Sequence, residues 1–359
     1  MKRRIGILTM AGATVLGAVL LAACLGTAGC STAGYYAQSI GGHLALLNAA
    51  RPVGDWLGEA STPEPLRERL ALAQRIRDYA VAELKLPDNA SYRRYADLRR
   101  PAAVWNVVAA PELSLTLKTW CFPVVGCVGY RGYFDRADAE ALAAQLRAEG
   151  YETAVYPVPA YSTLGRLNWL GGDPLLSTFI RYPEGELARL VFHELAHQVA
   201  YASDDTTFNE SFATAVERLG GARWLAQAGD AARSEYERYD ERRRQFRALT
   251  QRARTALDAV YRGEAADDVK RARKAGILAA LRAEHAALKA GPWAGFAGYD
   301  AWLERANNAS LGVVAAYNEL VPQFERLFER EGRDFARFYA EVRRIAALPK
   351  AERRVTLPP

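Results

Sequence analysis

Two histidines stand four residues apart in an apolar segment, 187–201, and their spacing limits what this segment can form. Pro183 and the acidic residues after it are suited to a helix start, so we expect one helix here. On a helix His193 and His197 project from one face, close enough to bind a single metal ion. Glu194 lies about 100° around the helix, beside the metal rather than on it. It is therefore a candidate general base for a water that the metal activates.

A catalytic zinc ion needs a third protein ligand besides two histidines, and Glu210 is the candidate. It stands thirteen residues after His197, in a second apolar segment that predicts a helix. The short polar turn 203–206 would let this helix fold back against the first. Glu217, farther along the same helix, is a less favoured alternative ligand. The competing interpretation is a pair of core histidines that neighbouring groups satisfy without a metal.

The first thirty residues have the layout of a bacterial lipoprotein signal. Three basic residues precede an apolar run, 5–23, and small residues then lead to Cys24 and Cys30. We expect cleavage before one of these cysteines and acylation of its thiol. The segment before Cys24 is the better local match, whereas an even number of remaining cysteines favours Cys30. The run is also long enough to remain as an uncleaved transmembrane anchor.

Acylation of either cysteine predicts a lipid-anchored protein of the bacterial cell envelope. Neither candidate cysteine is followed by Asp, which favours the periplasmic face of the outer membrane. If Cys30 carries the lipid, Cys24 leaves with the signal, and only Cys121 and Cys127 remain besides the anchor. In an oxidising compartment these two can close a short disulfide loop. Two buried free thiols are the alternative.

The charge of the chain gives little support to a nucleic-acid partner. The formal net charge is +6, and it falls to +3 when the three basic residues of the signal are removed. Four arginines gather at 242–247, but acidic residues stand among them, so we interpret this stretch as a solvated helix face. Half of the residues are hydrophobic, which is typical of a globular protein rather than a disordered one.

Helical and β-rich segments follow each other along the chain. Apolar residues recur at helical spacing over 64–86, whereas β-branched runs bounded by Pro and Gly occupy about 104–165. Within the β-rich part, Asp135 caps a predicted helix that stops at Gly150. Residues 160–164 could form one more strand.

Beyond Pro183 nearly the whole chain is predicted to be helical. The metal-binding helices span about 184–220, and a C-terminal helical part spans about 230–346. Two long charged segments there, 233–262 and 266–290, predict a helical hairpin. We therefore expect a single helix-rich α+β domain over 31–359, with a small β-sheet followed by the two metal helices and helical extensions.

The same residues resemble the bacterial lipoprotein family known as putative aminopeptidases, in the glutamate-ligand zincin class. The likeness covers almost the whole chain after the signal, and its segments keep one order. They are 35–38, 91–97, 104–106, 120–127, 130–133, 160–165, 192–198, 208–213 and 307–309, besides Gly29 and Cys30.

The resemblance implies one Zn²⁺ per chain, a zincin-like core, a peptidase site and a lipid anchor. His193, His197 and Glu210 would be the ligands, and Glu194 the base that activates the water. By analogy with thermolysin-like enzymes, residues 160–164 would be an edge strand that pairs with a peptide substrate, so that Tyr161 and Thr163 line the cleft. The candidate oxyanion donors are Tyr161, Tyr201 and Tyr317.

Two departures from related zincins are visible. Thr214 stands four residues after Glu210, where thermolysin-like enzymes have an acidic residue that orients a histidine ligand; Asp204, Asp205 or Glu217 must take that part. The segment by which a well-known aminopeptidase family binds the substrate amine is absent from the sequence. The alternatives are a zinc endopeptidase or cell-wall amidase with the same site, and a non-catalytic metal-binding scaffold lipoprotein of the envelope.

Overall fold

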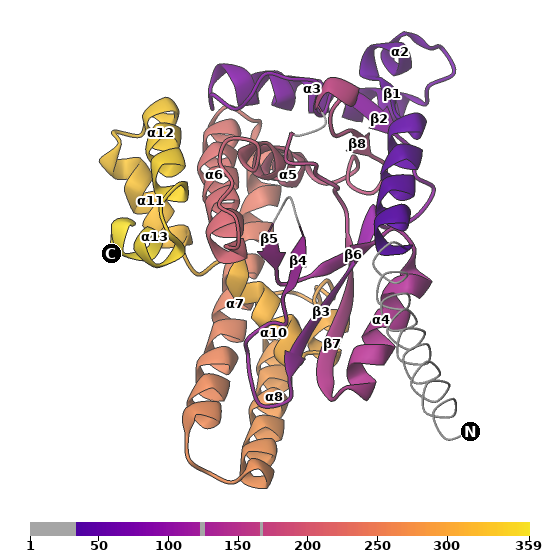
Figure 1. Ribbon diagram of the computed structural model, residues 1–359. Helices are drawn as coiled ribbons and strands as arrows, with labels where there is room; N and C mark the ends of the chain where they lie inside the picture. Colours follow the sequence, from indigo (N-terminus) through magenta and orange to yellow (C-terminus); the bar gives the residue numbers. More distant parts are fainter. Residues whose placement is uncertain (1–33, 123–125, 166–167) are drawn as a thin grey trace, which may run out of the picture. The chain divides into compact units, whose positions relative to one another are not determined.

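The computed structural model describes residues 34–122, 126–165 and 168–359 (Figure 1). The chain divides into two compact units between Asn48 and Ala49. In the first unit, residues 34–48 are helical. Within the described ranges, none of the helices combines the length and the apolarity that crossing a bilayer requires. The predicted signal, with Cys24 and Cys30, lies outside the described residues, and the single domain over 31–359 stays a prediction.

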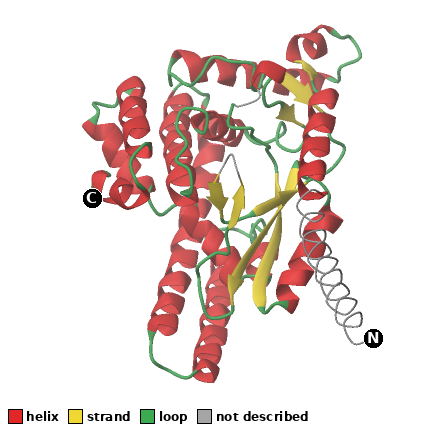
Figure 2. Ribbon diagram, viewed as in Figure 1, coloured by secondary structure: helices red, strands yellow, loops and turns green. Residues whose placement is uncertain are grey.

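The second unit, Ala49–Pro359, is rich in helices and holds only small sheets (Figure 2). Its first sheet has the order β1-β2-β8, with β2 and β8 parallel. Two helices accompany this sheet, and the longer one, predicted over 64–86, ends at residue 82. The bounds are β1 Arg51–Pro52, α2 Val53–Gly58, α3 Glu64–Ala82, β2 Arg94–Ala96 and β8 Leu175–Leu176.

An antiparallel sheet of order β6-β3-β7 forms the β-rich middle of this unit. Asp135 accepts a hydrogen bond from the Ala137 N–H and caps α4, as the sequence predicts. Helices α4 and α10 both contact β3 and β7. Val108 and Ala110, on one face of β3, pack against Ala309 of α10. The bounds are β3 Val104–Pro111, β6 Arg131–Tyr133, α4 Arg136–Ala148, β7 Tyr151–Val158 and α10 Asn308–Ala316.

Residues 160–164 form no strand, so the predicted edge strand is wrong. The Thr163 N–H donates to both carboxylate oxygens of Asp173, at 3.0 and 3.1 Å. Leu164 has a positive φ of 57°, which ends an extended course. The segment is therefore a loop whose backbone donor at Thr163 is already used.

A disulfide joins Cys121 and Cys127 across the hairpin of β4 (Trp120–Phe122) and β5 (Gly126–Val128). The Cys127 N–H donates to Asp204 Oδ1 at 2.6 Å, so the hairpin is attached to the turn between the two predicted metal helices. Gly126 has a φ of 75°, and a Cβ there would lie 2.4 Å from the same Asp204 oxygen. This contact therefore requires glycine.

The two helices that carry the predicted metal ligands, called the metal helices below, are α5 (Glu184–Ala196) and α6 (Thr206–Ala226), and they pack against each other. Asp205 caps α6 by accepting from the Phe208 N–H. The far side of α6 is buried by aromatic residues, since Phe208 and Phe212 contact Phe324 of α11. The C-terminal helices are α11 Val321–Arg330, α12 Phe335–Ala346 and α13 Lys350–Thr356.

The predicted helical hairpin is present as α7 (Asp230–Arg262) and α8 (Asp267–Ala290), which contact each other (Figure 1). Its core includes Leu249, Leu257 and Leu281, and the buried Trp293 belongs to the same cluster. Helix α7 also contacts α5, and α10 contacts α7. The hairpin is therefore tied through α7 to the metal helices. The short elements η1 (Asn168–Leu170) and α9 (Asp300–Glu304) complete the unit.

A glycine on α6 allows the close approach of the surrounding elements. A Cβ at Gly220 would lie 2.6 Å from Leu84 Cδ1 and 3.0 Å from Phe192 Cδ2. Both of these side chains are fully buried, so neither has space to move aside. A Cβ at Gly276 on α8, by contrast, would meet no described atom within 4 Å.

We expect Gly220→Ala to lower the free energy of unfolding by about 1–3 kcal/mol, because it overpacks a dense contact. The same substitution at Gly276 should raise the free energy of unfolding by about 0.5–1 kcal/mol, because alanine is the better helix former. Urea unfolding of the two variants beside the parent protein measures both changes. Equal effects at the two positions would contradict the close approach at Gly220.

Candidate metal centre

Helix α5 brings the two histidines to one face. It begins directly after Pro183, and His197 follows its last residue with helical φ and ψ of −58° and −22°. His197 therefore keeps the helical direction and lies one turn beyond His193. The Nε2 atoms of the two rings are 3.2 Å apart, and both side chains are buried.

Helix α6 adds Glu210 to the pair. Its Oε2 atom lies 3.4 Å from His193 Nε2 and 3.7 Å from His197 Nε2. Among the described residues, His193, His197 and Glu210 form a cluster of side chains that could hold a metal ion. The three separations of 3.2, 3.4 and 3.7 Å leave a point about 2.0 Å from every donor atom, which matches metal–imidazole and metal–carboxylate bonds. The donor set therefore fits a metal ion.

Glu217 orients His193 from the opposite side of the ring. Its Oε2 atom lies 3.0 Å from His193 Nδ1, so the Nδ1–H donates to it and Nε2 is left free for a metal. Seven residues separate Glu210 from Glu217, which puts both on the same face of α6. Of the three partners considered from the sequence, Glu217 is the one found at His193, and Glu210 rather than Glu217 faces both Nε2 atoms.

Arg189, one turn before His193 on α5, holds Glu217 in place. Its guanidinium is buried and forms an ion pair with the Glu217 carboxylate, while Asp240 of α7 lies 3.5 Å away. Burial alone would raise the pKa of Glu217, but the charge of Arg189 and the hydrogen bond from His193 lower it below its usual range. Glu217 is therefore a fixed negative charge behind the histidine.

The two acidic residues of the α5–α6 turn have other partners. Asp204 accepts from Cys127, and Asp205 caps α6 and forms an ion pair with Arg353 at 3.2 Å. Neither orients a histidine ligand. His197 Nδ1 is buried and has no hydrogen-bond partner among the described residues. The two histidines are therefore held unequally, His193 by a carboxylate and His197 by packing.

A cavity of about 480 Å³ lies beside the histidine pair. Its wall includes His193, Glu194 and Thr214 from the metal helices, and the end of β7 and the chain after it add residues 158–160. Helix α10 and its end contribute Val313, Val314, Tyr317 and Asn318, and α7 contributes Arg243, Phe246 and Arg247. With Tyr299 from the loop before α9, the space next to the candidate metal ligands is thus built from five separate parts of the sequence.

Tyr317 lines the cavity, and its ring lies against a candidate metal ligand. Its ring is stacked on His193, with centroids 6.2 Å apart and planes 19° apart. Burial, followed by the charge of Glu210, raises the pKa of Tyr317 well above its usual value. Its hydroxyl therefore keeps its proton at neutral pH and can donate a hydrogen bond.

The other predicted cleft residues have different surroundings. Tyr161 packs against Phe134 with ring centroids 5.2 Å apart, and Thr163 bonds to Asp173 through its backbone. Neither is among the residues that line the cavity. Burial and the charge of Glu210 raise the pKa of Tyr130 well above its usual value, which places this tyrosine near the metal ligands. Tyr130 belongs to a segment that carries the family resemblance but is not among the predicted site residues, because only the fold brings it there.

Arg243 and Arg247 correct the interpretation of residues 242–247 as a solvated face. Both line the cavity, and Arg243 binds both carboxylate oxygens of Glu186 on α5, at 2.8 and 3.1 Å. Arg244, in contrast, is exposed and pairs with Asp240 and Glu241 of its own helix. Local charge spacing could not separate these arginines, because the difference comes from the packing of α7 on α5.

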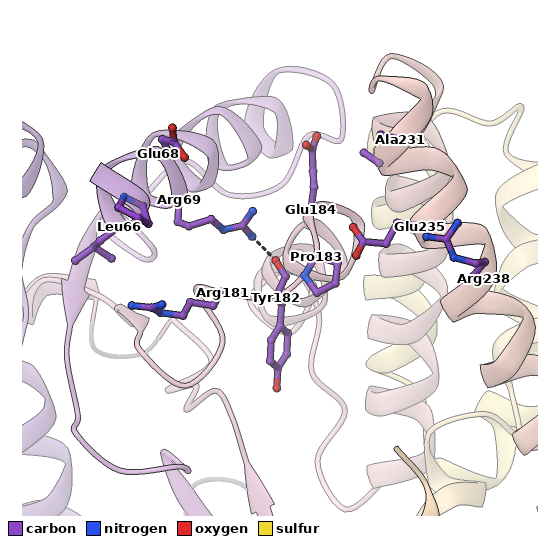
Figure 3. Close-up of a pocket in the computed structure, with 12 residues that line it drawn as sticks. Leu66, Glu68, Arg69, Arg181, Tyr182, Pro183, Glu184, Ala231, Glu235 and Arg238 are labelled. Atoms are coloured by element: carbon purple, nitrogen blue, oxygen red, sulfur yellow. Dashed lines mark hydrogen bonds between the residues drawn. The ribbon is translucent and has the colours of Figure 1, made fainter. Parts of the chain in front are cut away.

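A second cavity, of about 730 Å³, lies at the start of α5 (Figure 3). Leu66, Glu68 and Arg69 of α3 line one side, and Glu235 and Arg238 of α7 line the other. Arg69 donates to the carbonyl oxygens of Ile180 and Tyr182, so α3 holds the segment that leads into α5. None of the metal-ligand candidates lines this space, and Tyr182 lines both cavities.

We expect Glu217→Gln to weaken the binding of a divalent metal ion by about 10- to 100-fold, because the neutral amide orients His193 poorly. Competition with a chromogenic chelator measures this change. Glu325→Gln is the matched control, since Glu325 pairs with Arg218 of α6 but lies away from the histidines. Equal metal affinity of the parent protein and Glu217→Gln, with both folded by circular dichroism, would refute the orienting role.

A comparison with protein families finds one matching family model. The family model described as "Putative aminopeptidase" matches residues 34–357, which include both metal helices and the cavity. None of the curated proteins matches the chain, and none of the solved structures does. The resemblance inferred from the sequence is thereby confirmed at the level of the family. The chain belongs to the putative aminopeptidase family.

Proposed function

We propose that this protein is a zinc-dependent peptidase with a zincin-like core, in which His193, His197 and Glu210 bind the metal and Glu194 is the general base. The main support is the geometry of the three donor atoms, 3.2–3.7 Å apart, beside a cavity that Glu194 also lines. Two imidazoles and one carboxylate are a known ligand set of catalytic zinc in peptidases. Membership of the family is consistent with peptide hydrolysis.

Glu194 is suited to proton transfer because it is not engaged elsewhere. It is partly exposed in the cavity, and no ion pair or hydrogen bond of its carboxylate is found among the described residues. Zinc, when bound, lowers the pKa of a water and polarises the substrate carbonyl. Glu194 would accept a proton from that water as its oxygen bonds to the carbonyl carbon, and would give the proton to the amine nitrogen as the C–N bond breaks. Tyr317 donates a hydrogen bond from its hydroxyl to the carbonyl oxygen as negative charge develops there.

A catalytic site explains these residues better than a scaffold does. A structural zinc ion has four protein ligands and needs neither an unpaired carboxylate nor an adjacent cavity. Here three ligands converge, and both Glu194 and Tyr317 line the cavity beside them. Varying the substrate termini in the experiment separates endopeptidase from exopeptidase activity.

The peptidase is held at the cell envelope by a lipid on Cys30 or Cys24, on the periplasmic face of the outer membrane. This part of the proposal is supported by the signal-like sequence of the first thirty residues. The disulfide between Cys121 and Cys127 supports export independently, because such bonds persist in oxidising compartments. Mass spectrometry of the N-terminal peptide would identify the acylated cysteine.

We expect Glu194→Gln to lower kcat for peptide hydrolysis by about 10²- to 10⁴-fold while one Zn²⁺ per chain stays bound, because the amide cannot accept the proton. Hydrolysis is measured on peptides with free and with blocked amino termini, and zinc by atomic absorption. Cleavage confined to free termini would identify an aminopeptidase, and cleavage of blocked peptides an endopeptidase or a carboxypeptidase. Full activity of zinc-loaded Glu194→Gln, or a parent protein that binds no zinc, would refute the proposal.

We expect Tyr317→Phe to lower kcat by about 10²-fold with little change in zinc content, because one donor to the developing negative charge is lost. Tyr239→Phe is the matched control, since Tyr239 packs against Phe296 and lies outside the cavity. Steady-state kinetics on the best peptide substrate measures both variants. Should the two variants keep the same kcat as the parent, Tyr317 has no part in the reaction.

A further inference from the structure

Most of the charged side chains that line the catalytic cavity form ion pairs with other described residues. Two of them do not. Three carboxylates line it, from Glu186, Glu194 and Glu217. Glu186 binds Arg243, and Glu217 binds Arg189 and His193. Glu194 is the remaining carboxylate, and the proposed function gives it the role of base.

Three guanidinium groups line the same cavity, from Arg189, Arg243 and Arg247. Arg189 pairs with Glu217 and Asp240, and Arg243 pairs with Glu186 and Asp240. The guanidinium of Arg247 has no hydrogen bond and no ion pair with any described residue. It is therefore the cation of the cavity wall that forms no ion pair with the described residues, although Asp240 acts on it from a distance.

Arg247 is held in this unpaired position by the fold. Its side chain is partly buried, and Leu249 and Thr250, just beyond it on α7, are buried in the hairpin. Burial, and then the charges of Arg218 and Arg243, lower its pKa to about 10, so it stays protonated at neutral pH. A partly buried cation without a counter-ion is costly unless a ligand supplies the negative charge.

An apolar wall lies next to Arg247. Phe246, its neighbour on α7, is stacked on Tyr299 with ring centroids 4.1 Å apart and planes 10° apart. Val313 and Val314 of α10 line the same cavity. A ligand that fits here has an apolar side chain and a negatively charged group.

We infer that Arg247 is a specificity-determining residue, which binds a carboxylate of a peptide substrate whose neighbouring side chain is apolar. This inference rests on the proposed peptidase function. Charge-assisted bonds between a guanidinium and a carboxylate are strong and directional, so they would fix the peptide relative to Glu194. The carboxylate is the free C-terminus of a short peptide or an acidic side chain, and the experiment separates these two sources.

The cavity offers no matching site for a substrate amine among the described residues. Such a site needs an unpaired carboxylate, and Glu194 is the one cavity carboxylate without a partner among them. Its pairing with an amine would prevent it from accepting a proton. The arrangement of charges therefore selects a negatively charged end or side chain of the substrate rather than its amino terminus.

The test measures peptide binding to zinc-loaded Glu194→Gln protein, which leaves the peptide uncleaved. Four peptides share an apolar core sequence: one with a free C-terminal carboxylate, one amidated, and two amidated peptides that differ only in Asp against Asn. Isothermal titration gives Kd for each peptide. The same series is repeated with Arg247→Gln, with Arg247→Lys and with Arg238→Gln, each combined with Glu194→Gln. Arg238 is the matched control, an exposed arginine of α7 outside the catalytic cavity.

We expect the protein with Arg247 to bind the carboxylate peptide about 10- to 100-fold more tightly than its neutral partner. The preference should disappear in Arg247→Gln, return in part in Arg247→Lys and stay unchanged in Arg238→Gln. A preference between free and amidated C-termini identifies the terminal carboxylate, and one between Asp and Asn the side chain. Equal affinities for charged and neutral peptides, or a preference that survives Arg247→Gln, would overturn the inference.

The proposed function has a separate readout. If zinc-loaded parent protein hydrolyses none of the four peptides while the binding preference follows Arg247, the proposed peptidase activity fails on these peptides and the carboxylate site stands. If hydrolysis occurs but shows no dependence on the carboxylate, the activity stands and the carboxylate site fails. The two claims therefore cannot be mistaken for each other.

Discussion

The buried ion pair between Arg189 and Glu217 is the contact on which the candidate metal centre depends. Arg189 belongs to α5 and Glu217 to α6, and Asp240 of α7 also lies beside the guanidinium. Three helices are thus joined at one buried charge. Removing a single partner from such a pair leaves the other charge uncompensated, at a cost of about 3–5 kcal/mol. The same carboxylate fixes the ring of His193, so the stability of the helix pair and the direction of a ligand nitrogen depend on one side chain.

Helical spacing was enough to predict the candidate metal ligands, because a helix turns sequence separation directly into position. His193 and His197 had to share a face, and Glu210 could meet them once the polar turn reversed the chain. The proposed partner of His193 stayed open among three acidic residues. The seven-residue spacing on a helix puts Glu217 on the same face as Glu210. Only the packing of α6 on α5 decides which histidine nitrogen Glu217 contacts.

The predictions that were wrong, for residues 160–164 and for the arginines of α7, failed because long-range contacts decide these parts of the structure. Residues 160–164 have the composition of a strand, yet Asp173 takes the backbone donor of Thr163, and that competition is not visible in the local sequence. Arg243 and Arg247 stand in a stretch that looks solvated, because acidic and basic residues are mixed in it. Their burial follows from the packing of α7 on distant elements, and the partner of Arg243, Glu186, stands 57 residues earlier in the chain. Long-range contacts of this type carry no periodic signal.

The wall of the cavity has a consequence for how this family can diversify. The candidate metal ligands and the base belong to α5 and α6, whereas the apolar and cationic groups of the wall belong mainly to α7, α10 and the loop before α9. In the proposed peptidase, hydrolytic chemistry and substrate choice would therefore be encoded in separate stretches of the gene. Substitutions in the later stretch can alter which peptides are accepted while the metal helices keep their packing, so members with identical metal motifs need not share a substrate.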